Sequence, residues 1–223
     1  MQFAKQGAKL VVNYLKSEEE VLLVADEIKQ IGSDAIALQC DVFNEEQVKK
    51  MIDKIIKTFK RLDILVNNAG SYIDGDEWNG SSDIWEKTLK QDLISAMITS
   101  KYSAEIFQKQ KNGIIVNIAS HHSLFGQVNA LAYAASKAGI VSITQAYAKL
   151  LAPFGRANSV SPGAVNAGYW LRASKEEIDD VVSKMSSKKL IEPDEIASVV
   201  LFLTSDDSAR VNGQNVLVDD VKR

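Results

Sequence analysis

The 223-residue sequence has one cysteine and two histidines, and each scarcity argues against a class of protein. Cys40 has no second cysteine to pair with, so the chain has no internal disulfide, as is typical of proteins of the reducing cytosol. His121 and His122 are the only histidines, which argues against a zinc site, and we expect no metal. We therefore predict a cytoplasmic protein whose single cysteine is a small core residue.

Long apolar runs and a strong charge of one sign are also missing. No apolar run approaches the ~20 residues that a membrane-spanning helix needs, so we expect no membrane association. The formal net charge is -3 and no basic tract interrupts the chain, so we expect no nucleic-acid partner. The apolar fraction of 46% is enough for a large core, and the length suits one domain, which we place at residues 1–223.

Strand-like and helix-like patterns alternate along the chain. Strands are predicted at 9–13, 34–40, 62–66, 113–119, 157–160 and 215–219. Helices are predicted at 17–31, 45–59, 85–110, 130–151, 174–185 and 193–204. This order predicts an α/β fold, a doubly wound parallel sheet of Rossmann type with helices on both faces. The strand at 62–66 is nearly all apolar, so we expect it to be buried on both faces.

A tyrosine and a lysine lie four residues apart in the predicted helix 130–151. Tyr133 and Lys137 therefore share one helix face, where an ammonium group stabilises a phenolate and lowers the tyrosine pKa. Such a phenol is usable as a proton donor or acceptor near neutral pH. Alone, the pair is more typical of a surface tyrosine beside a solvated lysine. Ser120, which closes the strand 113–119, adds a hydroxyl that can bind a substrate oxygen.

Four segments of this sequence resemble the short-chain dehydrogenase/reductase family in their order and spacing. The segments are Leu62-Asp-Ile-Leu-Val-Asn-Asn-Ala-Gly70, Ile115-Val-Asn-Ile-Ala-Ser120, Tyr133-Ala-Ala-Ser-Lys137-Ala-Gly139 and Asn158-Ser-Val-Ser-Pro-Gly163. These segments are similar to those of 3-oxoacyl-[acyl-carrier-protein] reductases and of sugar and alcohol dehydrogenases. The resemblance covers essentially the whole chain and implies an NAD(P)(H)-dependent oxidoreductase that interconverts a carbonyl and a secondary alcohol.

The resemblance also implies roles for the residues of these motifs. Tyr133 is the general acid/base, Lys137 lowers its pKa and binds the nicotinamide ribose, and Ser120 orients the substrate oxygen. Asp92 stands where the family has a catalytic-site asparagine, and its carboxylate changes the charge around Lys137. The residues implied to line the cofactor, besides Tyr133 and Lys137, are Asp41, Val42, Asn67, Ala69, Gly70, Pro162, Gly163 and Val165.

The choice between the two nicotinamide cofactors depends on the end of the strand 9–13. Members of the family that prefer NAD(H) carry an acidic residue there, which grips the ribose diol. This strand ends at Asn13 and Tyr14, followed by Lys16, which could attract a phosphate. We therefore expect NADP(H), with NAD(H) as the alternative; a merely solvated Lys16 is an equally good interpretation.

The start of the chain departs from the family, whose members open with a strand and a glycine-rich turn that hold the pyrophosphate. Residues 1–10 resemble instead the end of the helix that follows this turn. We therefore expect an N-terminally incomplete domain that begins at an internal methionine, with the first strand and the glycine loop missing. The alternative to an enzyme is a shortened, non-catalytic scaffold of the same fold that cannot bind a dinucleotide.

The sequence says less about the identity of the substrate and about the oligomeric state. The loops that follow Ser120 and Gly163 could frame the substrate through His122, Phe125, Tyr169 and Trp170. An exposed loop histidine remains the more usual interpretation of His122, and Trp170 could instead pack in a lid or contact a subunit. The long helices 85–110 and 130–151 resemble those that pair between subunits in this family, so we expect a homo-oligomer, a tetramer or a dimer.

Overall fold

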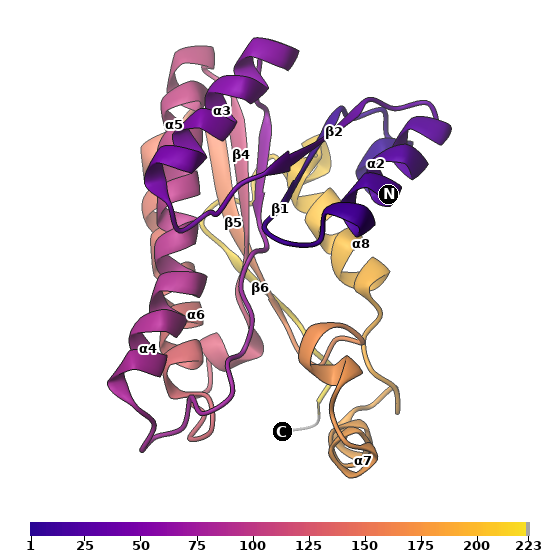
Figure 1. The fold of residues 1–223 in the computed structure, drawn as a ribbon, viewed down its shortest axis with the longest axis vertical. Coiled ribbons are helices and arrows are strands. Elements are labelled where there is room, and N and C mark those ends of the chain that lie inside the picture. The colour runs from indigo at the N-terminus through magenta and orange to yellow at the C-terminus, as the bar shows by residue number, and fades with distance from the viewer. Residues whose placement is uncertain (222–223) are drawn as a thin grey trace.

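The computed structural model describes residues 1–221 and consists of parallel strands covered by helices (Figure 1). The strands are β1 (Leu10–Tyr14), β2 (Ala35–Gln39), β3 (Ile64–Asn67), β4 (Gly113–Ile118), β5 (Gly155–Pro162) and β6 (Asn215–Val218). The helices are α1 (Gln2–Lys5), α2 (Glu18–Gln30), α3 (Glu45–Phe59), α4 (Ser82–Leu89), α5 (Ser95–Gln110), α6 (Leu131–Leu151), α7 (Lys175–Lys184) and α8 (Pro193–Thr204). Every pairing between these strands is parallel, so the predicted α/β fold is confirmed.

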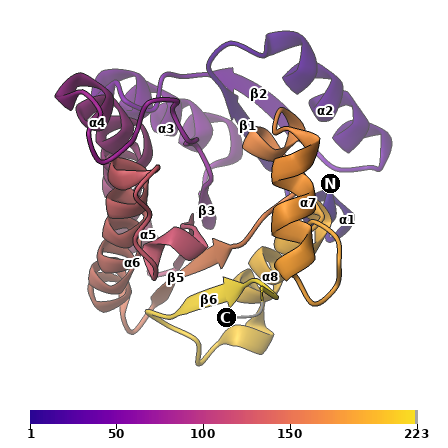
Figure 2. The ribbon, with the colours of Figure 1, turned by 90° about the horizontal axis from the view of Figure 1, so that it is seen from below.

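Helices cover both faces of the strands. Figure 2 shows α3, α4, α5 and α6 on one side and α2, α7 and α8 on the other. On one side, buried side chains of α5 and α6 pack against β4 and β5. On the other side, α8 packs against β4, β5 and β6. This layering is what a chain of alternating strands and helices produces when each strand buries apolar residues on both faces.

The strands form two separate sheets rather than one. One sheet has the order β1-β2 and the other the order β3-β4-β5-β6. Among residues 1–221 no strand pairs with the free edge of β1 or with that of β3. The expectation that residues 62–66 are buried on both faces is therefore wrong: Val66 is 37% exposed, because β3 has a neighbouring strand on one side only.

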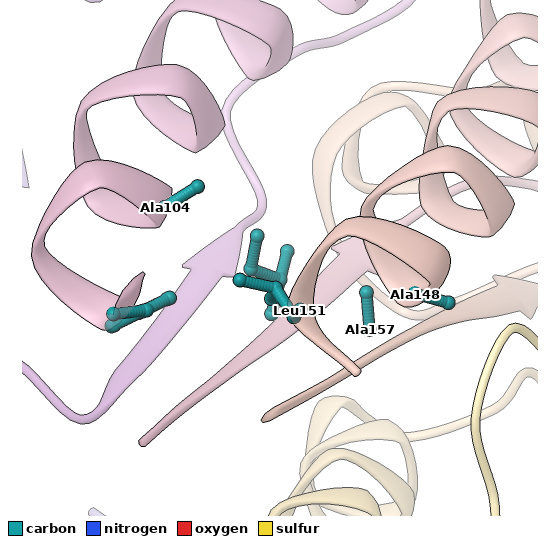
Figure 3. Close-up of a cluster of buried hydrophobic side chains, with 6 residues drawn as sticks. Ala104, Ala148, Leu151 and Ala157 are labelled. Atoms are coloured by element: carbon teal, nitrogen blue, oxygen red, sulfur yellow. The ribbon is translucent and has the colours of Figure 1, made fainter. Parts of the chain in front are cut away.

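The core around α6 sets the position of that helix (Figure 3). Ala104 of α5, Ala148 and Leu151 of α6, and Ala157 of β5 belong to one buried cluster. Alanines at these contacts let the helices approach the sheet closely, while Leu151, fully buried, fills the space between them. The C-terminal half of α6 is thereby packed tightly against β4 and β5, which fixes the direction of its N-terminal half.

The predicted helix 85–110 is interrupted by a π-helical turn. Residues Lys90–Ile94 form this turn between α4 and α5, without a break in the chain's helical course. A π-helical turn holds one extra residue relative to an α-helical one, which changes the direction of the side chains in it. Here it places Asp92, which is 1% exposed, inside the protein.

Cys40 is a core residue, as predicted. It is 2% exposed and packs in a cluster with Leu38, Val48 and Ile52. Burial raises the pKa of its thiol to about 11, so the thiol stays protonated and unreactive at neutral pH.

Neither a membrane-spanning helix nor a cluster of metal ligands occurs within residues 1–221. No helix there is long and apolar enough to span a bilayer. No group of three or more histidine, cysteine, aspartate and glutamate side chains is placed there to hold a metal ion.

Candidate active site

The structure brings Ser120, Tyr133 and Lys137 together at the carboxyl end of β4. Ser120 follows this strand and is 6% exposed, and its hydroxyl acts to lower the pKa of the Tyr133 phenol. Lys137 lies one turn after Tyr133 on α6, with its Nζ 5.4 Å from the centroid of the tyrosine ring. Its ammonium is buried and donates a hydrogen bond of 3.1 Å to the carbonyl oxygen of Ile118. Residues from two elements thus converge on one phenol.

The pKa of Tyr133 has the opposite shift from the one expected from the sequence. It is raised to about 12, first because burial disfavours the phenolate. The hydrogen bond from Ser120 lowers the pKa and the charge of Asp92 raises it further. Tyr133 is therefore a phenol at neutral pH, able to donate a proton but not to accept one.

Asp92 lies close to Lys137 in the interior. Its Oδ1 accepts a hydrogen bond of 3.0 Å from the backbone N–H of Ser71, and Ser136 lies 3.5 Å from its Oδ2. Burial raises the pKa of Asp92, and the ammonium of Lys137 opposes this shift. Burial likewise lowers the pKa of Lys137, and Asp92 opposes that. Each charge therefore stabilises the other at a buried position.

Gly70 is required where the loop after β3 passes over this pair. Its φ is +138°, and a Cβ there would lie 2.3 Å from Oδ1 of Asp92 and 3.5 Å from Nζ of Lys137. Only a residue without a side chain allows the backbone to approach the charged groups so closely. The space at Gly70 is therefore filled by the carboxylate of Asp92 beside Lys137.

Asp76 is a positioning residue that the sequence reasoning missed. Its side chain is fully buried, and its two carboxylate oxygens accept hydrogen bonds from the backbone N–H groups of Ala132 (2.8 Å) and Tyr133 (2.7 Å). It therefore caps the N-terminus of α6 from a loop 56 residues earlier in the chain. The one signal in the sequence is that Ala130, at the N-cap position, has no side chain that could do this.

Replacing Asp76 by alanine should lower the free energy of unfolding by about 2 kcal/mol, because two buried N–H donors lose their partner. Urea denaturation measures this change. The matched control is Asp74→Ala in the same loop, whose carboxylate is exposed and whose ion pair with Arg172 is 3.6 Å long. The control should change stability by less than about 0.5 kcal/mol. Equal losses in the two variants would contradict the capping role.

Replacing Asp92 by asparagine should lower the pKa of Tyr133, because the negative charge of Asp92 is one of the causes that raise it. In the acid/base role that the family resemblance implies for Tyr133, alcohol oxidation needs the phenolate as base, so the rising limb of its pH–rate profile should move to lower pH. The asparagine carbonyl can still accept the N–H of Ser71, which keeps the loop in place. A limb that stays where it is, or moves to higher pH, is inconsistent with the charge effect.

Asn67 is expected to line the cofactor, but its side chain forms hydrogen bonds to neighbouring elements of the protein. Its Nδ2 donates to Ser100 Oγ (2.9 Å) and to Asn117 Oδ1 (2.8 Å), and its Oδ1 accepts from Thr99 Oγ1 (2.7 Å). These bonds join β3 to α5 and β4. Asn67 therefore holds the loop that carries Ala69 and Gly70, whose exposed backbone is what remains for a ligand.

The end of β5 carries three further predicted residues. Pro162 is the last residue of β5 and is buried. The N–H of Gly163 donates to Val218 O (2.9 Å), and a Cβ on it would lie 2.6 Å from Asp219 Oδ1. Val165 makes an isolated parallel bridge with Ile191. This segment is thus joined to the end of β6, at the carboxyl ends of the strands, where Ser120 also lies.

The other four predicted cofactor residues belong to the two-stranded sheet. Asn13 is exposed on β1, and its Nδ2 donates to Leu38 O and Cys40 O, each at 3.1 Å. The hydroxyl of Tyr14 donates to Glu18 Oε1 at 3.1 Å. Asp41 accepts the N–H of Phe43 in the turn after β2, and Val42 packs into the apolar cluster of β2 and α3.

The residues present fit one end of a nicotinamide dinucleotide. The buried ammonium of Lys137, the phenol of Tyr133 and the exposed backbone of Ala69 and Gly70 suit a ribose and a flat ring. For the pyrophosphate, Gly7 is the only glycine before β1, and residues 1–9 form no glycine-rich turn. The fit is therefore good at the catalytic end of the site.

Comparison with known proteins places the chain among the dehydrogenases. It matches the family model described as enoyl-(acyl carrier protein) reductase over residues 1–220. It is 34% identical over 219 residues to the (2S)-[(R)-hydroxy(phenyl)methyl]succinyl-CoA dehydrogenase subunit BbsD of Thauera aromatica, which covers 98% of this chain and 88% of that protein. It is 29% identical over 218 residues to the 3-oxoacyl-[acyl-carrier-protein] reductase FabG of Thermotoga maritima, which covers 97% and 88%. The chain belongs to the short-chain dehydrogenase/reductase family.

A solved structure agrees with this assignment. NAD+-bound xylitol dehydrogenase superposes with a TM-score of 0.92 at 26% identity, over 98% of this chain and 91% of that one. The chain is therefore an oxidoreductase with the fold of the nicotinamide-dependent dehydrogenases, and its family implies a nicotinamide dinucleotide as cofactor.

Proposed function

We propose that the chain interconverts a carbonyl compound and a secondary alcohol with NAD(P)(H), with Tyr133 as general acid/base. The observation that carries this proposal is the phenol of Tyr133, which lies beside the hydroxyl of Ser120 and the buried ammonium of Lys137. A phenol, a hydroxyl and an ammonium at one point can polarise a carbonyl oxygen and deliver a proton to it. The names of the relatives all describe dehydrogenation or reduction, which supports the same chemistry.

The chain's own residues account for the proton steps. In reduction, the substrate oxygen accepts hydrogen bonds from Ser120 and Tyr133, and the Tyr133 proton moves to it as negative charge develops. The resulting phenolate is stabilised by the ammonium of Lys137, which Ile118 and Asp92 hold in place. A bound nicotinamide would supply or accept the hydride. In oxidation the phenol must first lose its proton. Because the pKa of Tyr133 is about 12, this loss becomes more favourable as the pH rises into the alkaline range.

Replacing Tyr133 by phenylalanine should reduce turnover about 1000-fold, because the proton donor is lost while the ring stays. Initial rates of NADPH and NADH consumption with a panel of ketones measure this loss. Tyr147→Phe on the same helix is the matched control and should stay within about twofold, since its hydroxyl makes only a 3.4 Å bond to Met97 O. Residual activity within tenfold of the parent would remove Tyr133 from the role of acid/base.

The alternative function, a non-catalytic scaffold, is favoured by one observation. The edges of β1 and β3 have no strand between them in residues 1–221, and no glycine-rich turn precedes β1 there. Fluorescence titration of the chain with NADPH and NADH separates the two functions. Binding of either cofactor together with reduction of any ketone in the panel supports the enzyme. The scaffold is supported when neither cofactor binds.

The preference for NADP(H) predicted from Asn13 and Lys16 stays a prediction. The structure adds a charge of the other sign, because Glu18 accepts a hydrogen bond from Tyr14 at the end of β1. Glu19 and Glu20 follow it in the first turn of α2. A carboxylate there disfavours a 2′-phosphate and suits a ribose diol. Both cofactors therefore belong in every assay of this chain.

A homo-oligomer paired through α5 and α6 is supported by apolar residues on that surface. Ile94 and Met97 are 40% and 42% exposed, and Leu150 of α6 is 48% exposed. Tyr147, one turn before Leu150, reaches Met97 O, so these side chains lie on one continuous surface. Light scattering after size-exclusion chromatography should give a dimer or tetramer, and Met97→Lys should reduce the mass. A monomeric parent chain would contradict this proposal.

A further inference from the structure

Aromatic rings gather around the phenol of Tyr133. The ring of Tyr72 lies edge-on to it at 6.5 Å between centroids and an angle of 83°. The ring of His122 lies at 6.2 Å and 77°. Tyr169 in turn lies 5.6 Å from Tyr72 at 82°, and Trp170 lies 5.4 Å from Tyr169. All of these are the edge-to-face geometries that aromatic rings prefer.

These rings come from three loops that meet beyond the carboxyl ends of the strands. Tyr72 follows β3, His122 follows β4 and Tyr169 follows β5, so each lies beyond the carboxyl end of a parallel strand. A substrate oxygen within reach of Ser120 and Tyr133 must therefore enter between these loops. The family motifs carry the phenol and the serine, whereas Tyr72 and Tyr169 lie outside those motifs and belong to this chain's own loops.

The positions of the rings are supported by polar contacts at the rim. The hydroxyl of Tyr169 donates a 2.6 Å hydrogen bond to Glu177 Oε1. The guanidinium of Arg172 lies 5.8 Å over the Tyr169 ring and 3.6 Å from Asp74, two residues after Tyr72. The loops after β3 and β5 are thus joined to each other in the ligand-free chain, with the tyrosine rings between them.

On the side of His122 the rings face apolar side chains, whereas Arg172, Asp74 and Glu177 lie at the rim beside Tyr169. Burial lowers the pKa of His122 to about 4, so its imidazole is neutral at physiological pH. Leu124, Phe125 and Leu171 on the same loops are 50%, 43% and 72% exposed. A hollow of about 280 Å³ lies beside His122, and its lining combines Phe125 and Val221 with Gln127 and Asp219.

We propose that the substrate carries a flat aromatic group on its carbonyl or carbinol carbon, as in an aryl ketone or an aryl secondary alcohol. This inference rests on the proposed function and names its substrate class. The aromatic group packs against Tyr72 and His122, while the oxygen reaches Ser120 and Tyr133. Tyr72 and Tyr169 are then specificity-determining residues: Tyr72 contacts the substrate and Tyr169 positions Tyr72.

A matched pair of ketones tests the aromatic requirement. Acetophenone and cyclohexyl methyl ketone have the same carbon skeleton, so their kcat/KM ratio reports the flat ring rather than size. Two edge-to-face contacts of about 0.5–1.5 kcal/mol each predict a preference for acetophenone of about tenfold or more. Tyr72→Leu should reduce this ratio several-fold, and Tyr72→Phe should keep it. Tyr102→Leu, the same change on α5 beside Glu45, should leave the ratio as in the parent.

A binding measurement makes the outcome independent of turnover. Quenching of tryptophan fluorescence by 1-phenylethanol and by 1-cyclohexylethanol reports binding near Trp170. Tighter binding of the phenyl alcohol, weakened by Tyr72→Leu, supports the substrate class even if no ketone is reduced, a result that would overturn the proposed function alone. Reduction of both ketones at equal kcat/KM overturns the substrate class and leaves the proposed function standing. Absence of any preference in both measurements overturns the inference.

Discussion

The buried ammonium of Lys137 is the group on which the rest of the site depends. An isolated charge at 4% exposure would cost several kcal/mol, so the protein must surround it with partners. Those partners come from different parts of the chain: the carbonyl of Ile118 ends β4, and the carboxylate of Asp92 lies in the π-helical turn. The loop at Gly70 closes over both. Three elements are therefore held together around one cation, which lies beside the ring of Tyr133.

A second buried acidic side chain, that of Asp76, fixes the position of α6 relative to the loop after β3. Asp76 binds the first N–H groups of α6, so the loop after β3 fixes the end of the helix that carries Tyr133. The other end of α6 is held by the cluster of Ala148 and Leu151. A helix fixed at both ends gives its tyrosine one position relative to Ser120. That rigidity is what proton transfer over a hydrogen bond demands.

Family membership accounts for the reaction better than for the substrate. The relatives include a dehydrogenase of a phenyl-substituted succinyl-CoA, a 3-oxoacyl reductase and a xylitol dehydrogenase, whose named substrates differ widely. Loops beyond the ends of the strands can vary without disturbing the sheet, so they are where substrate specificity is expected to be set. In this chain those loops present Tyr72, His122 and Tyr169.

The amino-acid sequence by itself determined the order of strands and helices and the family motifs that contain Ser120, Tyr133 and Lys137, because periodicity and short spacing are local properties. Helix 193–204 and helix 45–59 were predicted to the residue, and Tyr133 and Lys137 are one turn apart in any helix. Tertiary structure alone decided the raised pKa of Tyr133, since burial and the charge of Asp92 come from packing. It also decided the cap from Asp76, the half-exposed β3 and the ring contacts of Tyr72. Each of these depends on groups far apart in the chain, which no local pattern brings together.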